Sequence, residues 1–95
     1  MLILHVTFRT KPGTRELFVK EVLEAGIAKA SKAEKGNYFY DFYFSAENED
    51  DVMLLEKWEN QEALDIHSNQ PHYAAIGEIK KKYEVSTQIE KYEIK

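Results

Sequence analysis

The chain of 95 residues contains no cysteine. It therefore forms no disulfide bond and offers no thiolate for catalysis or metal binding, and we expect it in a reducing compartment, the cytoplasm. No apolar run approaches the roughly 20 residues that a membrane-spanning helix needs. The opening stretch MLILHVTFRT has no basic lead-in, and its apolar run is too short for a secretory signal. The sequence therefore predicts neither a membrane protein nor an exported one.

The chain also has fewer basic than acidic residues. Thirteen Lys and Arg residues stand against 17 Asp and Glu residues, so the formal net charge is −4. An acidic chain is a poor partner for a nucleic-acid polyanion, and we expect no nucleic acid binding. The local run Lys80-Lys81-Lys82 is typical of a solvated helix end. The aromatic run from Tyr38 to Phe44 superficially resembles an RNA-binding signature, but that signature belongs on a third strand in a basic setting.

Proline is rare, and both prolines mark breaks between elements. Pro12 follows a strand pattern, and Pro71 divides a helical pattern, where it suits the first turn of a new helix. Asn60 is a typical N-cap residue. The apolar phase of the last strand shifts between Ile89 and Tyr92, which predicts a bulge or a strand end that leaves the sheet. Apolar periodicity predicts strands over residues 2–9, 38–46, 51–59 and 85–94, and helices over residues 14–34, 60–68 and 71–82.

The predicted elements follow the order strand, helix, strand, strand, helix, strand, with the second helix broken in two. This βαββαβ order predicts one α+β domain over residues 1–95, with a ferredoxin-like antiparallel sheet and the helices on one face. The second strand carries aromatic rings on both faces, for example Tyr40 on one and Phe39 on the other. A domain of this size covers one sheet face by itself, so we expect a partner subunit on the second face.

Three stretches of the sequence carry a resemblance to a known family. They are the aromatic strand after Lys35-Gly36-Asn37, the run LEKWENQEAL at 55–64 with His67 behind it, and Pro71-His72-Tyr73. Together with Pro12-Gly13 and the element order, they resemble the antibiotic biosynthesis monooxygenase (ABM) family over about residues 2–92. The resemblance implies a homodimer in which two sheets close into a shared α+β barrel. It also implies a cleft between sheet and helices in each subunit.

The family resemblance implies several chemistries. Some members oxidise phenolic or hydroquinone substrates with O2 and without flavin, haem or metal, because the deprotonated substrate can itself pass an electron to O2. Others isomerise a small phosphorylated signalling metabolite of the autoinducer-2 processing type, and a third group degrades haem. The haem degraders use an asparagine and an axial histidine where this chain has Val6 and Ile76. We therefore predict a cofactor-free monooxygenase acting on a small aromatic or quinol-like substrate and O2, with the isomerase or a non-catalytic dimeric ligand-binding protein as alternatives.

Three residues are the expected catalytic groups: Trp58, His67 and His72. Trp58 is expected to wall the cleft and stack on a flat substrate; the alternative is a core aromatic. His67 is expected to take or return a proton, because its ordinary pKa lies near neutrality; the alternative is a residue of the helix surface. His72 lies just inside a helix start, where the helix dipole favours the neutral, basic form of the ring; the alternative is a structural contact to the preceding turn.

Five further residues are expected to bind substrate: Glu56, Tyr73, Asn37, Tyr38 and Tyr40. Each is alternatively a packing residue. Glu56 shares its strand face with Trp58, so its burial would raise its pKa or require an ion-pair partner. No metal site is expected, because His67 and His72 are five positions apart with Pro71 between them, unlike the i,i+4 pairs of helical metal sites.

Overall fold

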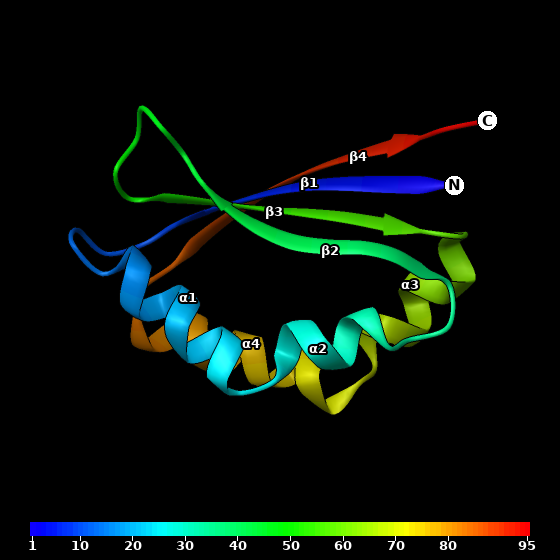
Figure 1. The fold of residues 1–95 in the computed structure, drawn as a ribbon, viewed down its shortest axis with the longest axis horizontal. Helices are drawn as coiled ribbons and strands as arrows, with labels where there is room; N and C mark the ends of the chain where they lie inside the picture. The colour runs from blue at the N-terminus through cyan, green and yellow to red at the C-terminus, as the bar shows by residue number, and fades with distance from the viewer.

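A four-stranded antiparallel sheet organises residues 1–95 in the computed structural model (Figure 1). Its strands lie in the order β2-β3-β1-β4, so β3 and β1, which are not consecutive along the chain, are neighbours at the centre. Residues alternate between a buried and a half-exposed face along both central strands, as the sequence predicts. The strands are β1 (Leu2–Arg9), β2 (Asn37–Phe44), β3 (Asp51–Trp58) and β4 (Ser86–Glu93). The predicted ferredoxin-like α+β fold is confirmed.

All four helices lie on one face of this sheet, and the opposite face carries no helix (Figure 1). The Asn60 side chain caps α3 by accepting a hydrogen bond from the Ala63 amide at 2.9 Å. Pro71 starts α4, as predicted. No helix is both long and apolar enough to cross a membrane. The helices are α1 (Arg15–Glu24), α2 (Ile27–Lys32), α3 (Gln61–Ser68) and α4 (Pro71–Lys82).

The prediction of one continuous helix over residues 14–34 is wrong. Gly26 has a left-handed backbone with φ of +75° and divides the segment into α1 and α2. A glycine adopts this conformation without steric cost, and it redirects the chain. Both pieces then bury apolar side chains against the sheet, Phe18 and Val22 from α1 and Ile27 from α2. Packing on a twisted sheet thus overrides the local helical periodicity.

The predicted irregularity of the last strand, a bulge or an end that leaves the sheet, is also wrong. β4 pairs with β1 without interruption from Leu2 opposite Glu93 to Arg9 opposite Ser86. β4 is an edge strand with mostly exposed side chains, so its apolar phase need not follow the pleat. The irregularity lies instead in β2, where Tyr38 is the extra residue between two paired positions.

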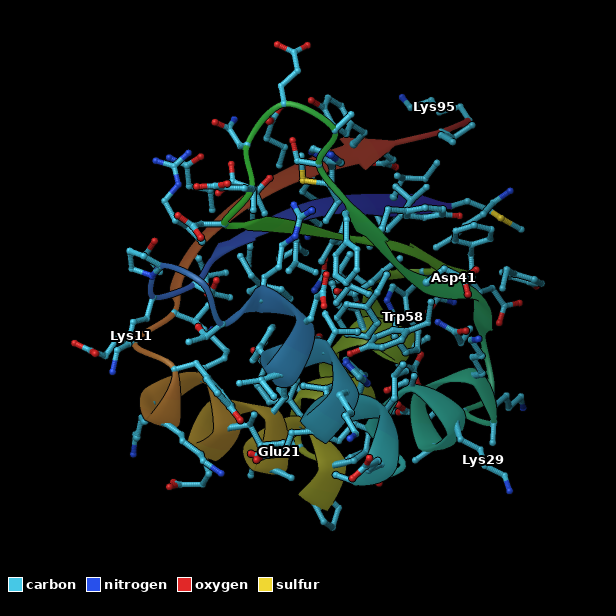
Figure 2. All side chains as sticks on the ribbon, turned by 60° about the vertical axis from the view of Figure 1, so that its left-hand side comes forward. Lys11, Glu21, Lys29, Asp41, Trp58 and Lys95 are labelled. Carbon is cyan, nitrogen blue, oxygen red and sulfur yellow. The ribbon has the colours of Figure 1, made fainter.

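The core lies between the helix-facing side of the sheet and the four helices. Trp58 at the end of β3 is fully buried there, and Figure 2 shows it between the sheet and the helices. Beside it the polar side chains of Glu56 on β3 and His67 on α3 are buried in the same layer. That region holds most of the predicted site residues.

Candidate active site

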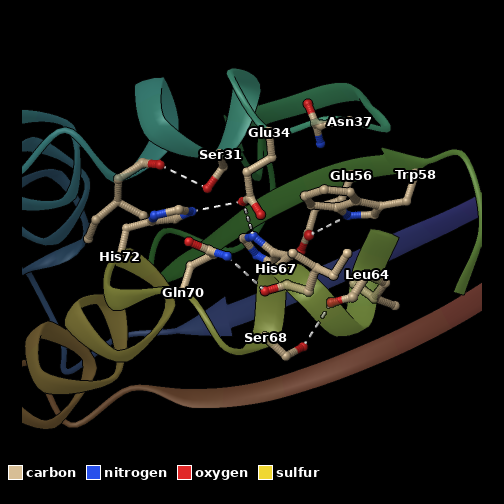
Figure 3. Close-up of polar contacts among 12 residues, drawn as sticks. Ser31, Glu34, Asn37, Glu56, Trp58, Leu64, His67, Ser68, Gln70 and His72 are labelled. Atoms are coloured by element: carbon tan, nitrogen blue, oxygen red, sulfur yellow. Dashed lines mark hydrogen bonds and ion pairs between the residues drawn. The ribbon is translucent and has the colours of Figure 1, made fainter. Parts of the chain in front are cut away.

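A single carboxylate joins the two predicted histidines. Glu34 Oε2 lies 2.5 Å from His67 Nδ1 and 2.8 Å from His72 Nε2 (Figure 3). His67 is in the last turn of α3, His72 is in the first turn of α4, and Glu34 follows α2. The exposed fraction of the side chain is 4% for His67, 17% for His72 and 12% for Glu34. The three groups therefore form one shielded hydrogen-bonded unit.

The local backbone explains why these groups meet. The helical pattern breaks at Gln70 and Pro71, so His67 and His72 belong to different helices and turn toward the same carboxylate. On the other side, Gly36 has φ of +88°, and a Cβ there would lie only 2.8 Å from the Ala63 Cβ. The chain that carries Glu34 can therefore pack directly against α3 only because residue 36 has no side chain.

The pKa of His67 is lowered, mainly because burial penalises the charged ring, while the hydrogen bond and charge of Glu34 oppose the shift. His67 is therefore neutral at pH 7. An ionised carboxylate can only accept, so the proton of the neutral ring lies on Nδ1 and is donated to Glu34. The other ring nitrogen, Nε2, then carries a free lone pair and has no hydrogen-bond partner within the chain. This tautomer makes His67 a proton acceptor.

Glu56 and Trp58 form a second polar pair on β3. The indole Nε1 of Trp58 donates a hydrogen bond to Glu56 Oε1 at 3.0 Å (Figure 3). Burial raises the pKa of Glu56 to about 7; the indole hydrogen bond opposes this shift, and the charge of Glu34 adds to it. Glu56 therefore exchanges its proton near neutral pH, which suits a carboxyl group that takes part in proton transfer.

A cavity of about 110 Å³ lies between the sheet and α4 and brings several of these groups together. Val6, Leu54, Ile76 and Ile89 are among its apolar walls. The His67 ring meets the rings of Tyr73 and Tyr40 edge-on, with centroids 5.4 Å and 5.9 Å away. Burial and the charge of Glu56 raise the pKa of Tyr40, which keeps its hydroxyl protonated. The polar residues that line the cavity are Tyr40, Glu56, His67, Tyr73, Lys80 and Thr87.

Four of the eight predicted site residues lie outside this cavity. Trp58 packs behind His67 with ring centroids 4.6 Å apart, and its complete burial leaves no face on which a ligand in the cavity could stack. His72 contacts Glu34 and does not line the cavity. Asn37 donates its amide hydrogens to backbone carbonyl oxygens of β2 and β3. Tyr38, the bulged residue, is 55% exposed.

Three residues of the site were not predicted. Glu34 has no sequence signal, because only the folded chain brings the end of α2 to the two histidines. Lys80 follows Tyr73 and Ile76 at helical spacing, i, i+3 and i+7, and this pattern places it on the same face of α4. Thr87 alternates with Ile89 on the inner side of β4. The last two could have been found from periodicity.

Glu34, His67 and His72 are also the one group of side chains whose ligand atoms approach metal-site spacing, within 4.8 Å of one another. Two imidazoles and a carboxylate suit zinc or ferrous iron. The spacing argument against a metal does not apply, since the histidines lie on separate helices. An ion at bonding distance of about 2 Å would nevertheless have to replace both hydrogen bonds to Glu34. The geometry is that of two imidazoles sharing one carboxylate.

Comparison with known proteins agrees with the motifs. The sequence matches the Antibiotic biosynthesis monooxygenase family over residues 1–78. It is 32% identical over 73 residues to the Bacillus subtilis (strain 168) protein named "Putative monooxygenase YcnE", a match that covers 77% of this chain and 75% of that protein. It is 26% identical over 72 residues to the uncharacterized protein sll1783 of Synechocystis, covering 76% of this chain and 48% of that protein.

Solved structures share the whole fold. A conserved protein of unknown function from Bacteroides thetaiotaomicron, described as a possible oxidoreductase, superposes with a TM-score of 0.86 at 28% identity, covering 98% of this chain and 96% of that one. An antibiotic biosynthesis monooxygenase-like protein from Deinococcus radiodurans gives the same TM-score at 23% identity, covering 100% of this chain and 93% of that one; this likeness concerns the fold alone. Because the family model matches residues 1–78, the chain belongs to the antibiotic biosynthesis monooxygenase family.

Proposed function

We propose that this chain is a cofactor-independent monooxygenase that oxidises a small phenolic or hydroquinone substrate with O2. The observation that carries the proposal is the neutral His67, held by Glu34 in one tautomer at the wall of a cavity that also contains a carboxyl group titrating near neutrality. A phenol bound in this cavity would meet a proton acceptor that is already oriented.

Glu34 supports proton transfer in two ways. Its hydrogen bond to His67 Nδ1 fixes the ring so that Nε2 is free to accept the phenolic proton. Its negative charge then stabilises the imidazolium that forms, as a carboxylate does behind any histidine that acts as a base. His72 donates to the same oxygen and keeps the carboxylate in place. His67 is thus the catalytic base, and Glu34 and His72 are positioning residues.

The oxidation then proceeds without a further reductant. The phenolate gives one electron to O2, and the resulting radical pair combines into a peroxide at a ring carbon that bears hydrogen. His67 returns its proton to the peroxide. Loss of the ring proton and cleavage of the O–O bond release water and leave a quinone. One phenol and one O2 thus yield one quinone and one water, and Glu56 is placed to take the ring proton.

The size of the cavity supports a small substrate. An apolar cavity of about 150 Å³ in another protein accommodates benzene, so about 110 Å³ limits the buried part of a ligand to roughly one aromatic ring. Ligand sites for larger organic groups occupy several hundred Å³. This volume favours a reaction in which the substrate, rather than a bound flavin or haem, supplies the electrons.

We further propose that the chain is a homodimer joined through the helix-free face of its sheet. That face carries half-buried Ile3, Phe39 and Leu55 and the exposed rings of Tyr43 and Tyr92. No helix covers these side chains (Figure 1). A second copy would bury them by sheet-on-sheet packing, in line with the barrel that the family resemblance implies.

Oxygen uptake by the purified, EDTA-treated protein tests the enzymatic proposal. We expect uptake with single-ring phenols and hydroquinones and no added cofactor, with one atom of ¹⁸O2 recovered in the product. His67→Gln should lower kcat by about 100-fold or more, whereas Ser68→Ala, an exposed neighbour on α3, should leave it unchanged. Isomerisation of a keto or phosphorylated metabolite without O2 uptake would instead support the isomerase, and ligand binding without turnover would support a non-catalytic protein.

A further inference from the structure

Lys80 is a cation at the cavity without an anionic partner. Its ammonium lies 5.3 Å from the centre of the Phe8 ring, and no carboxylate lies within ion-pair distance of it. The neighbouring lysines are paired, Lys81 with Glu78 and Lys82 with Glu21. Burial of the Lys80 side chain lowers its pKa, as expected for a charge that is partly removed from water and not compensated.

Thr87 offers a second unpartnered group at the same place. Its hydroxyl oxygen is buried and has no hydrogen-bond partner, one of two such side-chain atoms in the chain. Thr87 lies directly opposite Phe8 in the β1–β4 ladder, so Thr87 and Lys80 both adjoin the Phe8 ring. A buried hydroxyl and a partly buried ammonium that lack partners at one end of a cavity together indicate an absent hydrogen-bond acceptor.

The other end of the cavity is the proton-accepting end. Glu56 lies opposite Leu4 of β1, whereas Thr87 lies opposite Phe8, so the two are four residues apart along that strand. At about 3.3 Å per residue the two backbones are offset by about 13 Å along the strand direction, and β1 lies between their strands, so the two side chains mark opposite ends of the cavity. Apolar side chains, among them Val6 and Leu54, line the stretch between them.

We propose that the Lys80–Thr87 end binds the carboxylate of a single-ring phenolic acid, whose hydroxyl group points to His67. The position of the hydroxyl group at His67 rests on the proposed function. The position of the carboxylate rests only on the unpartnered side chains of Lys80 and Thr87. One ammonium and one hydroxyl match the charge and the two oxygens of a carboxylate. A phosphate dianion has a further oxygen and charge for which this end of the cavity supplies no donor.

Binding measurements on the full chain test the proposal independently of turnover. Titration calorimetry would compare 4-hydroxybenzoate with its methyl ester, with phenol and with 4-hydroxyphenyl phosphate. We expect the acid to bind about tenfold or more tightly than the ester. Lys80→Met should abolish this preference while leaving the affinity for phenol nearly unchanged, and Thr87→Val should reduce it. Lys81→Met, on the neighbouring exposed and ion-paired lysine, is the matched control and should retain the preference.

Equal affinity for acid and ester, or an unaltered preference in Lys80→Met with a native circular dichroism spectrum, would overturn the proposal. Tighter binding of the aryl phosphate than of the carboxylate would overturn the choice of anion. The proposed function fails separately: selective binding of the acid without O2 uptake leaves the anion site standing and removes the monooxygenase. Conversely, a Lys80→Met variant that oxidises a phenolic acid with the wild-type KM would retain the monooxygenase and remove the anion site.

Discussion

Glu56 links the electrostatics of the site to the stability of the fold. Its folded-state pKa is about 7 against an ordinary value of 4.5, so the folded protein holds a proton that the unfolded chain has released between these pH values. The free energy of unfolding therefore decreases as pH rises through this window, by about 3 kcal/mol for this group. Glu56→Gln removes the effect. Relative to wild type, the variant should gain stability by about that amount between pH 4.5 and pH 8 in urea unfolding.

The matched control for this experiment is Glu62→Gln, an exposed carboxyl in the first turn of α3. Its stability difference from wild type should be nearly the same at both pH values. A Glu56→Gln difference that is likewise constant with pH would show that the Glu56 carboxyl ionises as an ordinary exposed group, contrary to its burial.

Glu34 affects how His67 titrates. Its hydrogen bond and its charge both raise the pKa of His67 against the effect of burial. Glu34→Gln keeps a hydrogen-bond acceptor but removes the charge, so the pKa of His67 should fall further, which NMR titration of the ring resonances measures. If the chain is the proposed enzyme, kcat should fall by about 100-fold with a smaller change in KM, because the imidazolium forms only during reaction. A His67 titration unchanged from wild type would contradict the shared-carboxylate geometry.

At the scale of the elements, Gly36 determines how closely β2 approaches α3. Alanine at this position has an unfavourable positive φ, and its Cβ would also lie 2.8 Å from the Ala63 Cβ. Gly26→Ala is the matched control, since its φ is also positive but nothing lies within 4 Å of the added atom. We expect Gly26→Ala to cost about 1 kcal/mol and Gly36→Ala about 2–3 kcal/mol. Chemical denaturation measures both, and equal costs would show that the contact with Ala63 is easily relieved.

The elements that the sequence predicted are those with local signals. Alternating apolar residues defined β1 and β3, and Asn60 and Pro71 defined the starts of α3 and α4. The break at Gly26 was missed because the helical pattern continues across it, and only packing on the sheet requires the change of direction. The same limit applies to the bulge in β2.

The residues of the candidate site also divide into those with a local sequence signal and those that only the folded chain brings together. His67, Glu56, Tyr40 and Tyr73 were predicted from motif and strand phase, and the fold brings them to one cavity. Glu34 could not be predicted, because it contacts residues 33 and 38 positions away in the sequence. Trp58 lies next to His67 and Glu56, but it is fully buried and does not line the cavity. Local sequence patterns do not indicate how deeply a residue is buried in the core.

At the scale of the whole molecule, the helix-free sheet face makes a prediction about assembly. Leu55 lies in the middle of that face, opposite His5 in one neighbouring strand and Asp41 in the other. Leu55→Lys would place a charge at the centre of the proposed dimer interface and should convert the dimer to a monomer in sedimentation velocity experiments at micromolar concentration. Ile66→Lys is the control, because Ile66 is 52% exposed on a helix and should leave the dimer intact.

The same experiment separates assembly from the site. The cavity is lined by residues of one chain and lies on the helix side of the sheet, away from the proposed interface. A monomeric Leu55→Lys variant should therefore still bind a single-ring phenol. Any loss of affinity should come only from increased mobility of the sheet once its outer face is exposed to water. A wild-type chain that sediments as a monomer would rule out the dimer, and it would require that Ile3, Phe39 and Leu55 remain in contact with solvent in the native protein.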